Sequence, residues 1–357
     1  MPGRTPITSR KSERQSLPWT RLSDDELLQL RFSDLKLKLS GSRLERRLQR
    51  IHDELQKRGI TFRPHMWLAE EWFSPDGVPG IAVPFYLAHP RLMRLERRMM
   101  KQVEGGNDNW MMRILRHEAG HAVDTAYRLR RRADWRDAFG PASLPYPDSY
   151  QARPGSRRYV QHLGDWYAQS HPTEDFAETF AVWLKPNSDW RRAYESWPAR
   201  NKLTLVDELM RGVASGAPLV RSRRHVEPLH TNTRTLAEHY VEKLRRHEAW
   251  RNESADGLML RVFTPATATP SARVTPSVCR AAAYLRAHRR ELVEAVAKSS
   301  GTDRYTIYQL LRIAIHRCAE LDLRLRRSER ATLPHVRWLL GGMVRTLDRG
   351  ARPKLHL

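Results

Sequence analysis

The strongest constraint on this 357-residue chain is a pair of histidines four positions apart, in the run HEAGH at positions 117–121. The run lies in an apolar stretch, residues 108–132, whose spacing predicts a helix. Residues i and i+4 share one helix face, so His117 and His121 can bind one zinc ion while Glu118 stands at its edge. A catalytic zinc site needs three protein ligands and one open position, so the chain must supply a third ligand.

A second polar pair follows about fifty residues later, in the run PTEDFAETF at positions 172–180. Glu174 and Glu178 share one predicted helix face, and Phe176 and Phe180 share another that suits packing. The alternative for two such glutamates is a solvent-exposed acidic face. In a basic chain with two candidate histidines we favour a zinc-associated pair, because buried carboxylates need charged partners. The residues alone leave open which glutamate is the ligand.

Together the two runs resemble the active-site sequence of the gluzincin metallopeptidases. The likeness is strongest to the module shared by anthrax lethal factor and a family of bacterial zinc-binding metallopeptidases, and it covers about residues 60–205. In that module a glutamate on the second helix is the third ligand, a second acid follows four residues later, and an active-site tyrosine precedes the ligand by seven. The resemblance therefore implies Glu174 as ligand, Glu178 as hydrogen-bond acceptor of a liganding imidazole, and Tyr167 as the tyrosine.

The resemblance also implies a fold class and a reaction. It implies a zincin-like metallopeptidase domain. Together with the strand and helix patterns along the chain, it gives an expected fold that is α+β and mostly helical, with a small edge-stranded sheet and a C-terminal helical domain. The reaction would be hydrolysis of peptide bonds in a peptide or protein substrate, with one Zn²⁺ per chain held by His117, His121 and Glu174. Glu118 would act as general base and Tyr167 would donate to the oxyanion.

Other residues near the two runs have weaker signals. Asp124 lies one helical turn beyond His121 and is either a hydrogen-bond partner of that imidazole or an exposed acid. His162 and His171 are interpreted as loop or cap groups rather than catalytic ones. Residues 60–88 predict two short strands with a turn at 75–77.

Proline inside the second of these runs predicts an edge strand. Pro84 cannot donate a hydrogen bond to a sheet, so its strand should have one free side. An extended substrate can pair with such a side through its main chain, which makes residues 80–88 the candidate substrate-lining strand.

The pattern along the chain predicts five segments. These are a disordered basic lead at 1–20, the metallopeptidase domain at 21–230, a connecting helix with a short extended segment at 231–261, a Pro/Thr/Ala linker at 262–277, and a basic helical domain at 278–357. Helices are expected from about residue 24, at 42–58, 90–102, 108–132, 159–184 with a break at 170–172, and 190–210. Apolar stripes at 278–297, 303–325 and 334–347 predict a C-terminal three-helix unit.

Charge suggests a second class of function. The chain has 63 Lys and Arg against 40 Asp and Glu, a formal charge of +23, and residues 271–357 hold 18 basic against 7 acidic residues. The alternative is therefore a basic protein that binds nucleic acid or an acidic protein partner through its C-terminal domain, with a structural or catalytically idle zinc site. We expect no membrane partner and a cytoplasmic location, because neither a spanning segment nor a secretory signal is evident.

Overall fold

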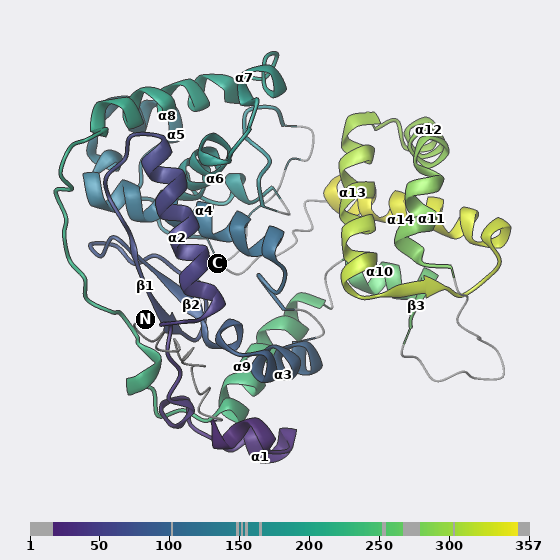
Figure 1. Ribbon diagram of the computed structural model, residues 1–357. Coiled ribbons are helices and arrows are strands. Elements are labelled where there is room, and N and C mark those ends of the chain that lie inside the picture. Colours follow the sequence, from purple (N-terminus) through teal and green to yellow (C-terminus); the bar gives the residue numbers. More distant parts are fainter. Residues whose placement is uncertain are drawn as a thin grey trace, which may run out of the picture.

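The computed structural model describes residues 17–100, 103–147, 150, 153, 156–163, 166–251, 255–266, 279–302 and 304–348. Over these residues the protein is mostly helical with two small sheets, which confirms the expected fold class (Figure 1). None of the helices in these ranges is both long and apolar enough to cross a lipid bilayer.

The α-helices are α1 Asp24–Leu28, α2 Arg43–Lys57, α3 Pro90–Met100, α4 Asp108–Tyr127, α5 Ala133–Phe139, α6 Pro172–Leu184, α7 Trp190–Ala193, α8 Ala199–Val213, α9 Leu236–Arg251, α10 Ala255–Val262, α11 Ala281–Ala287, α12 Arg289–Ser300, α13 Arg304–Glu320 and α14 Glu329–Asp348. The strands are β1 His65–Ala69, β2 Gly80–Pro84, β3 Phe263–Pro265 and β4 Leu323–Leu325. Short 3₁₀ turns are η1 Pro18–Arg21, η2 Phe32–Leu35, η3 Phe85–Ala88, η4 Leu129–Arg131, η5 Tyr167–Gln169 and η6 Leu229–Thr231.

Helix α4 is the centre of the first apolar core, which gathers side chains from Trp19 to Tyr240. The helix begins because the Asn107 side chain accepts a hydrogen bond from the Trp110 amide, and it ends at Arg128 in the left-handed conformation. Nearly every residue from Met111 to Tyr127 is buried. A helix that is covered on all sides belongs to a protein interior, so its polar side chains must find partners inside the fold.

Helices α4 and α6 approach each other closely at Gly120. A β-carbon at this position would lie 3.0 Å from the Ala177 Cα and 3.1 Å from the Phe180 ring. The glycine inside the histidine run is therefore needed for packing, and it brings the two predicted ligand helices together.

We expect Gly120→Ala to lower the free energy of unfolding by about 1–2 kcal/mol through overpacking, although alanine favours a helix by about 1 kcal/mol over glycine. The matched control is Gly212→Ala in α8, where no atom lies within 4 Å of the new β-carbon. That control should be neutral or stabilising. Urea unfolding of both variants measures the difference, and equal stabilisation by both would refute the packing role of Gly120.

The first sheet differs from the expected edge arrangement. Strands β1 and β2 are parallel, with His65 opposite Gly80 and Ala69 opposite Pro84. On its other side β2 is paired through Ala82, whose amide donates to the Phe73 carbonyl at 2.8 Å. The prediction that residues 80–88 form a free edge strand therefore holds only in part: β2 is an edge of a two-stranded sheet, but Phe73 bridges its outer side at Ala82, and residues 85–88 form η3. Proline is tolerated there because it is the last residue of the strand.

Several predicted helices are shorter than expected. The helix expected from residue 24 stops after α1, because the Phe32 amide donates to the Arg234 carbonyl and the Leu236 amide to the Leu30 carbonyl. The helix expected at 159–169 is wrong: residues 156–163 are irregular and only η5 precedes α6.

A second apolar core joins α10 to α14 with β3 and β4. The first expected stripe is two helices, α11 and α12, with a turn at His288, so the described tail has four helices where three were expected. Residues 262–265 of the expected linker end α10 and form β3, which pairs antiparallel with β4. They belong to this core, and residues 267–277 of the linker lie outside the described residues.

Candidate metal centre

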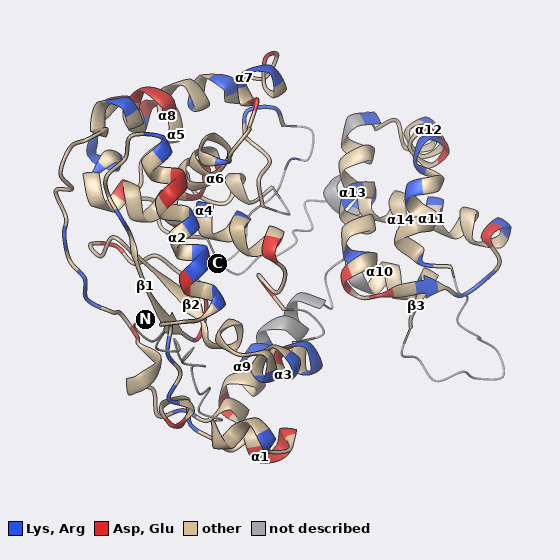
Figure 2. Ribbon diagram, in the orientation of Figure 1, with Lys and Arg blue, Asp and Glu red and all other residues tan. Residues whose placement is uncertain are grey.

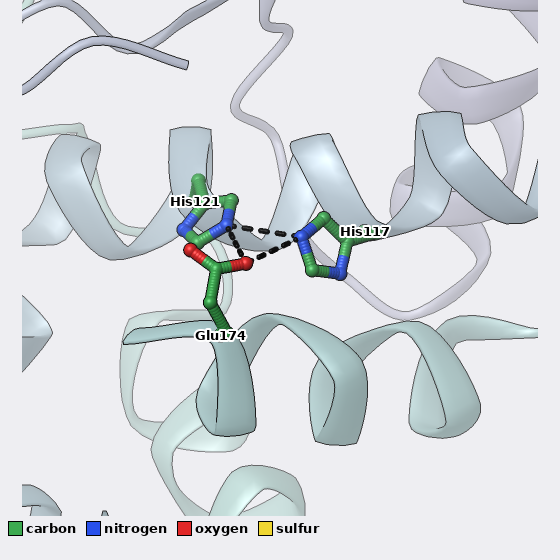
Figure 3. Close-up of side chains that lie close together, drawn as sticks. All are labelled: His117, His121 and Glu174. Atoms are coloured by element: carbon green, nitrogen blue, oxygen red, sulfur yellow. Dashed lines mark hydrogen bonds and ion pairs between the residues drawn. The ribbon is translucent and has the colours of Figure 1, made fainter. Parts of the chain in front are cut away.

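Three buried side chains from α4 and α6 converge on one point (Figure 3). The Glu174 Oε2 atom lies 2.9 Å from His117 Nε2 and 3.2 Å from His121 Nε2, and the two imidazole nitrogens are 3.1 Å apart. All three residues are at most 8% exposed. The structure thus brings together the ligands that the sequence and the resemblance predicted.

The geometry suits a zinc ion. A tetrahedral zinc with ligand bonds of about 2.0–2.1 Å separates its ligand atoms by about 3.3 Å, close to the distances above. Two imidazole nitrogens and one carboxylate oxygen are also the donor set of known catalytic zinc sites. Among the described residues, this is the one group of His, Cys, Asp and Glu side chains arranged to hold a metal ion.

Glu178 fixes the orientation of the first imidazole. Its Oε1 atom lies 2.9 Å from His117 Nδ1, and its Oε2 atom accepts a hydrogen bond from the Leu163 amide at 2.8 Å. With Nδ1 engaged by a carboxylate, His117 presents Nε2 toward Glu174 and His121. This contact is the one the resemblance implied for Glu178.

The electrostatics of the site couple carboxylates to imidazoles. Burial disfavours the charged form of His117, but Glu174 and Glu178 outweigh it and raise the pKa of His117 well above its usual value. Burial likewise opposes ionisation of Glu174, yet His121 and His117 hold the pKa of Glu174 well below its usual value. A metal ion that binds His117 Nε2 must therefore displace a proton.

Glu118 has a carboxylate oxygen ready for a new partner. The residue is 7% exposed, and its Oε2 atom is buried and has no hydrogen bond to any residue that the structure describes. Its main-chain carbonyl accepts a hydrogen bond from the Ser74 hydroxyl at 3.2 Å, which ties α4 to the segment after β1. A buried carboxylate without a partner is costly, so such groups are typically found where a ligand completes them.

Tyr167 lies beside the ligands at the start of η5. Its ring centroid is 5.5 Å from that of His117. Burial, together with Glu174 and Glu118, raises the pKa of Tyr167 well above its usual value, so its hydroxyl keeps its proton and can donate a hydrogen bond. The structure therefore places the predicted tyrosine next to His117, one of the three residues that could hold a metal ion.

Tyr146 is a site residue that the sequence did not reveal. Its hydroxyl donates to Glu174 Oε1 at 2.8 Å, and its ring stacks on His171 with centroids 3.9 Å apart. Burial and the Glu174 carboxylate raise the pKa of Tyr146. The residue stands in a Pro-rich segment without periodicity, so only its aromatic character could have drawn attention to it.

The remaining polar candidates have structural partners. Asp124 accepts hydrogen bonds from the main-chain amide and the side chain of Arg130, at 2.8 and 2.6 Å, and so braces the end of α4. Its support of His121 stays a prediction. His171 caps α6 by accepting a hydrogen bond from the Thr173 amide, as the cap interpretation predicted. His162 is likewise a buried loop residue, with Nε2 2.9 Å from the Arg113 carbonyl.

Residues 95–197 match the model of a family described as "Putative zinc-binding metallo-peptidase". The match spans α4, α6 and the predicted ligands. It covers less than a third of the chain. It supports a zinc-binding metallopeptidase site and contains nothing specific to gluzincins or lethal factor. No curated protein and no solved structure matches the chain.

Tyr146→Phe should weaken zinc binding about tenfold, the lower end of the effect of removing a hydrogen-bond partner of a ligand. The variant keeps the ring that stacks on His171 and removes the hydroxyl that donates to Glu174 and also contacts the Thr173 hydroxyl. Competition with a chromogenic zinc chelator measures the affinity. Tyr284→Phe, which removes a tyrosine hydroxyl from the C-terminal core, is the matched control and should leave zinc affinity unchanged. Equal affinities for both variants and the unmodified chain would contradict the role of Tyr146.

Because of His162, the free energy of unfolding should decrease on mild acidification. Burial lowers the pKa of His162 from 6.5 to about 4. The unfolded chain therefore binds a proton below pH 6.5 that the folded chain does not, and stability declines as pH falls from 6.5 toward 4. Relative to His162→Gln, the unmodified chain should lose about 2 kcal/mol more between pH 7 and pH 5. Urea unfolding at both pH values tests this, and parallel losses would disprove it.

Proposed function

We propose that the protein is a zinc-dependent peptidase of gluzincin type that binds one zinc ion per chain. The observation that carries this proposal is the convergence of His117, His121 and Glu174, next to Glu118, whose Oε2 atom has no hydrogen bond to any described residue. The family match over the same helices supports it.

A bound zinc ion would supply Lewis acidity, lowering the pKa of water and polarising a peptide carbonyl. Glu118 would accept a proton on its free Oε2 atom and pass it to the amine that leaves. Tyr167, which keeps its phenolic proton, would donate a hydrogen bond to the oxygen on which negative charge develops. Glu178 would hold His117 in the tautomer whose Nε2 is available.

The segment at Phe73 is the better candidate for the substrate edge. It pairs antiparallel with Ala82 on the side of β2 away from β1, and Ser74 contacts the Glu118 carbonyl. An extended peptide paired with the outer side of this segment would lie close to the general base. We propose this position in place of β2.

The C-terminal helices would form an accessory domain. Their apolar core, from Met259 to Val344, is separate from the core that surrounds the metal centre. A separate core is what an independently folding unit needs. The alternative role of this basic region, binding of nucleic acid, rests on its charge alone.

Metal content and hydrolysis together test the function. The unmodified chain should contain about one zinc per molecule by mass spectrometry, and His117→Ala and Glu174→Ala should lose it. Glu118→Gln should keep the zinc and lose at least about 100-fold in hydrolysis of denatured casein, because general base catalysis contributes that much or more.

The exposed Glu195→Gln variant is the control and should match the unmodified chain in both measurements. Zinc retained after loss of Glu174 would refute the ligand assignment. Full hydrolysis by Glu118→Gln would refute the catalytic assignment while leaving the metal centre intact.

A further inference from the structure

The outer side of β1 is an open strand edge. The N–H and C=O groups of Ala82 bond to Phe73, on the side of β2 away from β1. The main-chain groups of its neighbours in β2, Ile81 and Val83, therefore face β1. In this parallel register the main-chain groups of Trp67 face β2. The main-chain groups of its neighbours, Met66 and Leu68, therefore face away from the sheet. No hydrogen bond among the described residues engages these outward groups.

These outward groups need a partner. Met66 and Leu68 both line a hollow beside this edge, and main-chain N–H and C=O groups are strong hydrogen-bonding groups that are almost always paired. An unpaired strand edge is also a template for another strand. The edge is therefore prepared for an extended polypeptide rather than for a nucleic acid, which has no matching alternation of donors and acceptors.

A groove follows this edge. Two adjoining hollows of about 450 and 190 Å³ share Leu39, Met66 and His225 in their walls. One wall is the connection between α8 and α9, which runs past β1 in Figure 1. This wall is held by the Trp67 indole, which donates to the Val226 carbonyl at 2.8 Å.

The groove is basic. Its walls include Lys36, Arg63 and Arg223, against a single acid, Glu45. That acid already accepts a hydrogen bond from the Gly41 amide at 2.6 Å. Figure 2 shows further basic positions on the connection between α8 and α9.

The pKa values of two histidines in the groove also indicate a positive environment. Burial lowers the pKa of His52 and of His65, and nearby guanidinium groups lower both further: Arg63 and Arg223 act on His52, and Arg223 acts on His65. Cations that repel a proton attract an acidic ligand.

The longer segments of the chain outside the described residues are unsuited to bind in this groove. Residues 1–16 hold four Lys and Arg and one Glu, residues 267–278 hold one Arg and no acid, and residues 349–357 hold three basic residues and no acid. All three have the same sign of charge as the groove. The occupant that fits both the strand edge and the charge is an acidic segment of another protein.

We propose that the outer edge of β1 binds an extended acidic peptide segment of a partner protein as an added strand. Met66 and Leu68 pair with its main chain, and Arg63 and Arg223 attract its carboxylates. This edge is opposite the Phe73 side of the sheet, so the inference holds whether or not the metal centre is catalytic.

A fluorescein-labelled heptapeptide of alternating glutamate and valine tests the proposal on the full chain. Fluorescence anisotropy should show binding that weakens about tenfold in Arg223→Glu and changes less than about twofold in Arg221→Glu. Arg221 belongs to the same connection but not to the groove walls. Zinc content should be unchanged in both variants, which shows that the metal centre is intact.

Hydrogen–deuterium exchange distinguishes strand pairing from attraction by charge alone. The amides of Met66 and Leu68 should exchange at least about tenfold more slowly with the peptide bound. Binding without protection of these two amides would overturn the proposal. Equal binding of a lysine–valine peptide, or tighter binding of a short RNA without that protection, would overturn it as well.

Discussion

The close approach of α4 and α6 is the contact on which the metal centre depends. Gly120 lets the Ala177 backbone come within contact distance, and the same interface brings Glu174 within 3.2 Å of both imidazole nitrogens. A bulkier residue between the helices would separate ligands that are more than fifty positions apart in the sequence. Packing and ligand geometry are therefore set by one interface.

Glu178 links that interface to the irregular chain before α6. One of its oxygens engages His117 and the other accepts the Leu163 amide. The His162 side chain contacts a carbonyl of α4, so this stretch satisfies polar groups on α4 and α6 rather than within a helix of its own. That is why residues 156–163 are irregular despite their apolar spacing.

The sequence predicted what depends on spacing within a helix. The i, i+4 pairs of His117 with His121 and Glu174 with Glu178 fall on facing surfaces of α4 and α6, and the resemblance supplied the choice of Glu174 and the place of Tyr167. Contacts between distant segments were not predictable this way. The bridge from Phe73 to Ala82, which occupies the outer side of β2 at that residue, and the hydrogen bond from Tyr146 to Glu174 both join segments with no shared periodicity.

The placement of charge explains how one basic protein can offer two opposite kinds of site. Among the described residues, buried charged side chains are mostly acidic. The acids are Glu54, Glu96, Glu118, Asp124, Glu174, Asp175 and Glu178, against Arg91 and Arg116. Burying acids leaves the surface more basic than the net charge of +23 suggests. The acidic interior thus favours a cation at the candidate metal centre, while the basic groove at the outer edge of β1 favours an anion. The charge around each site disfavours the ligand of the other.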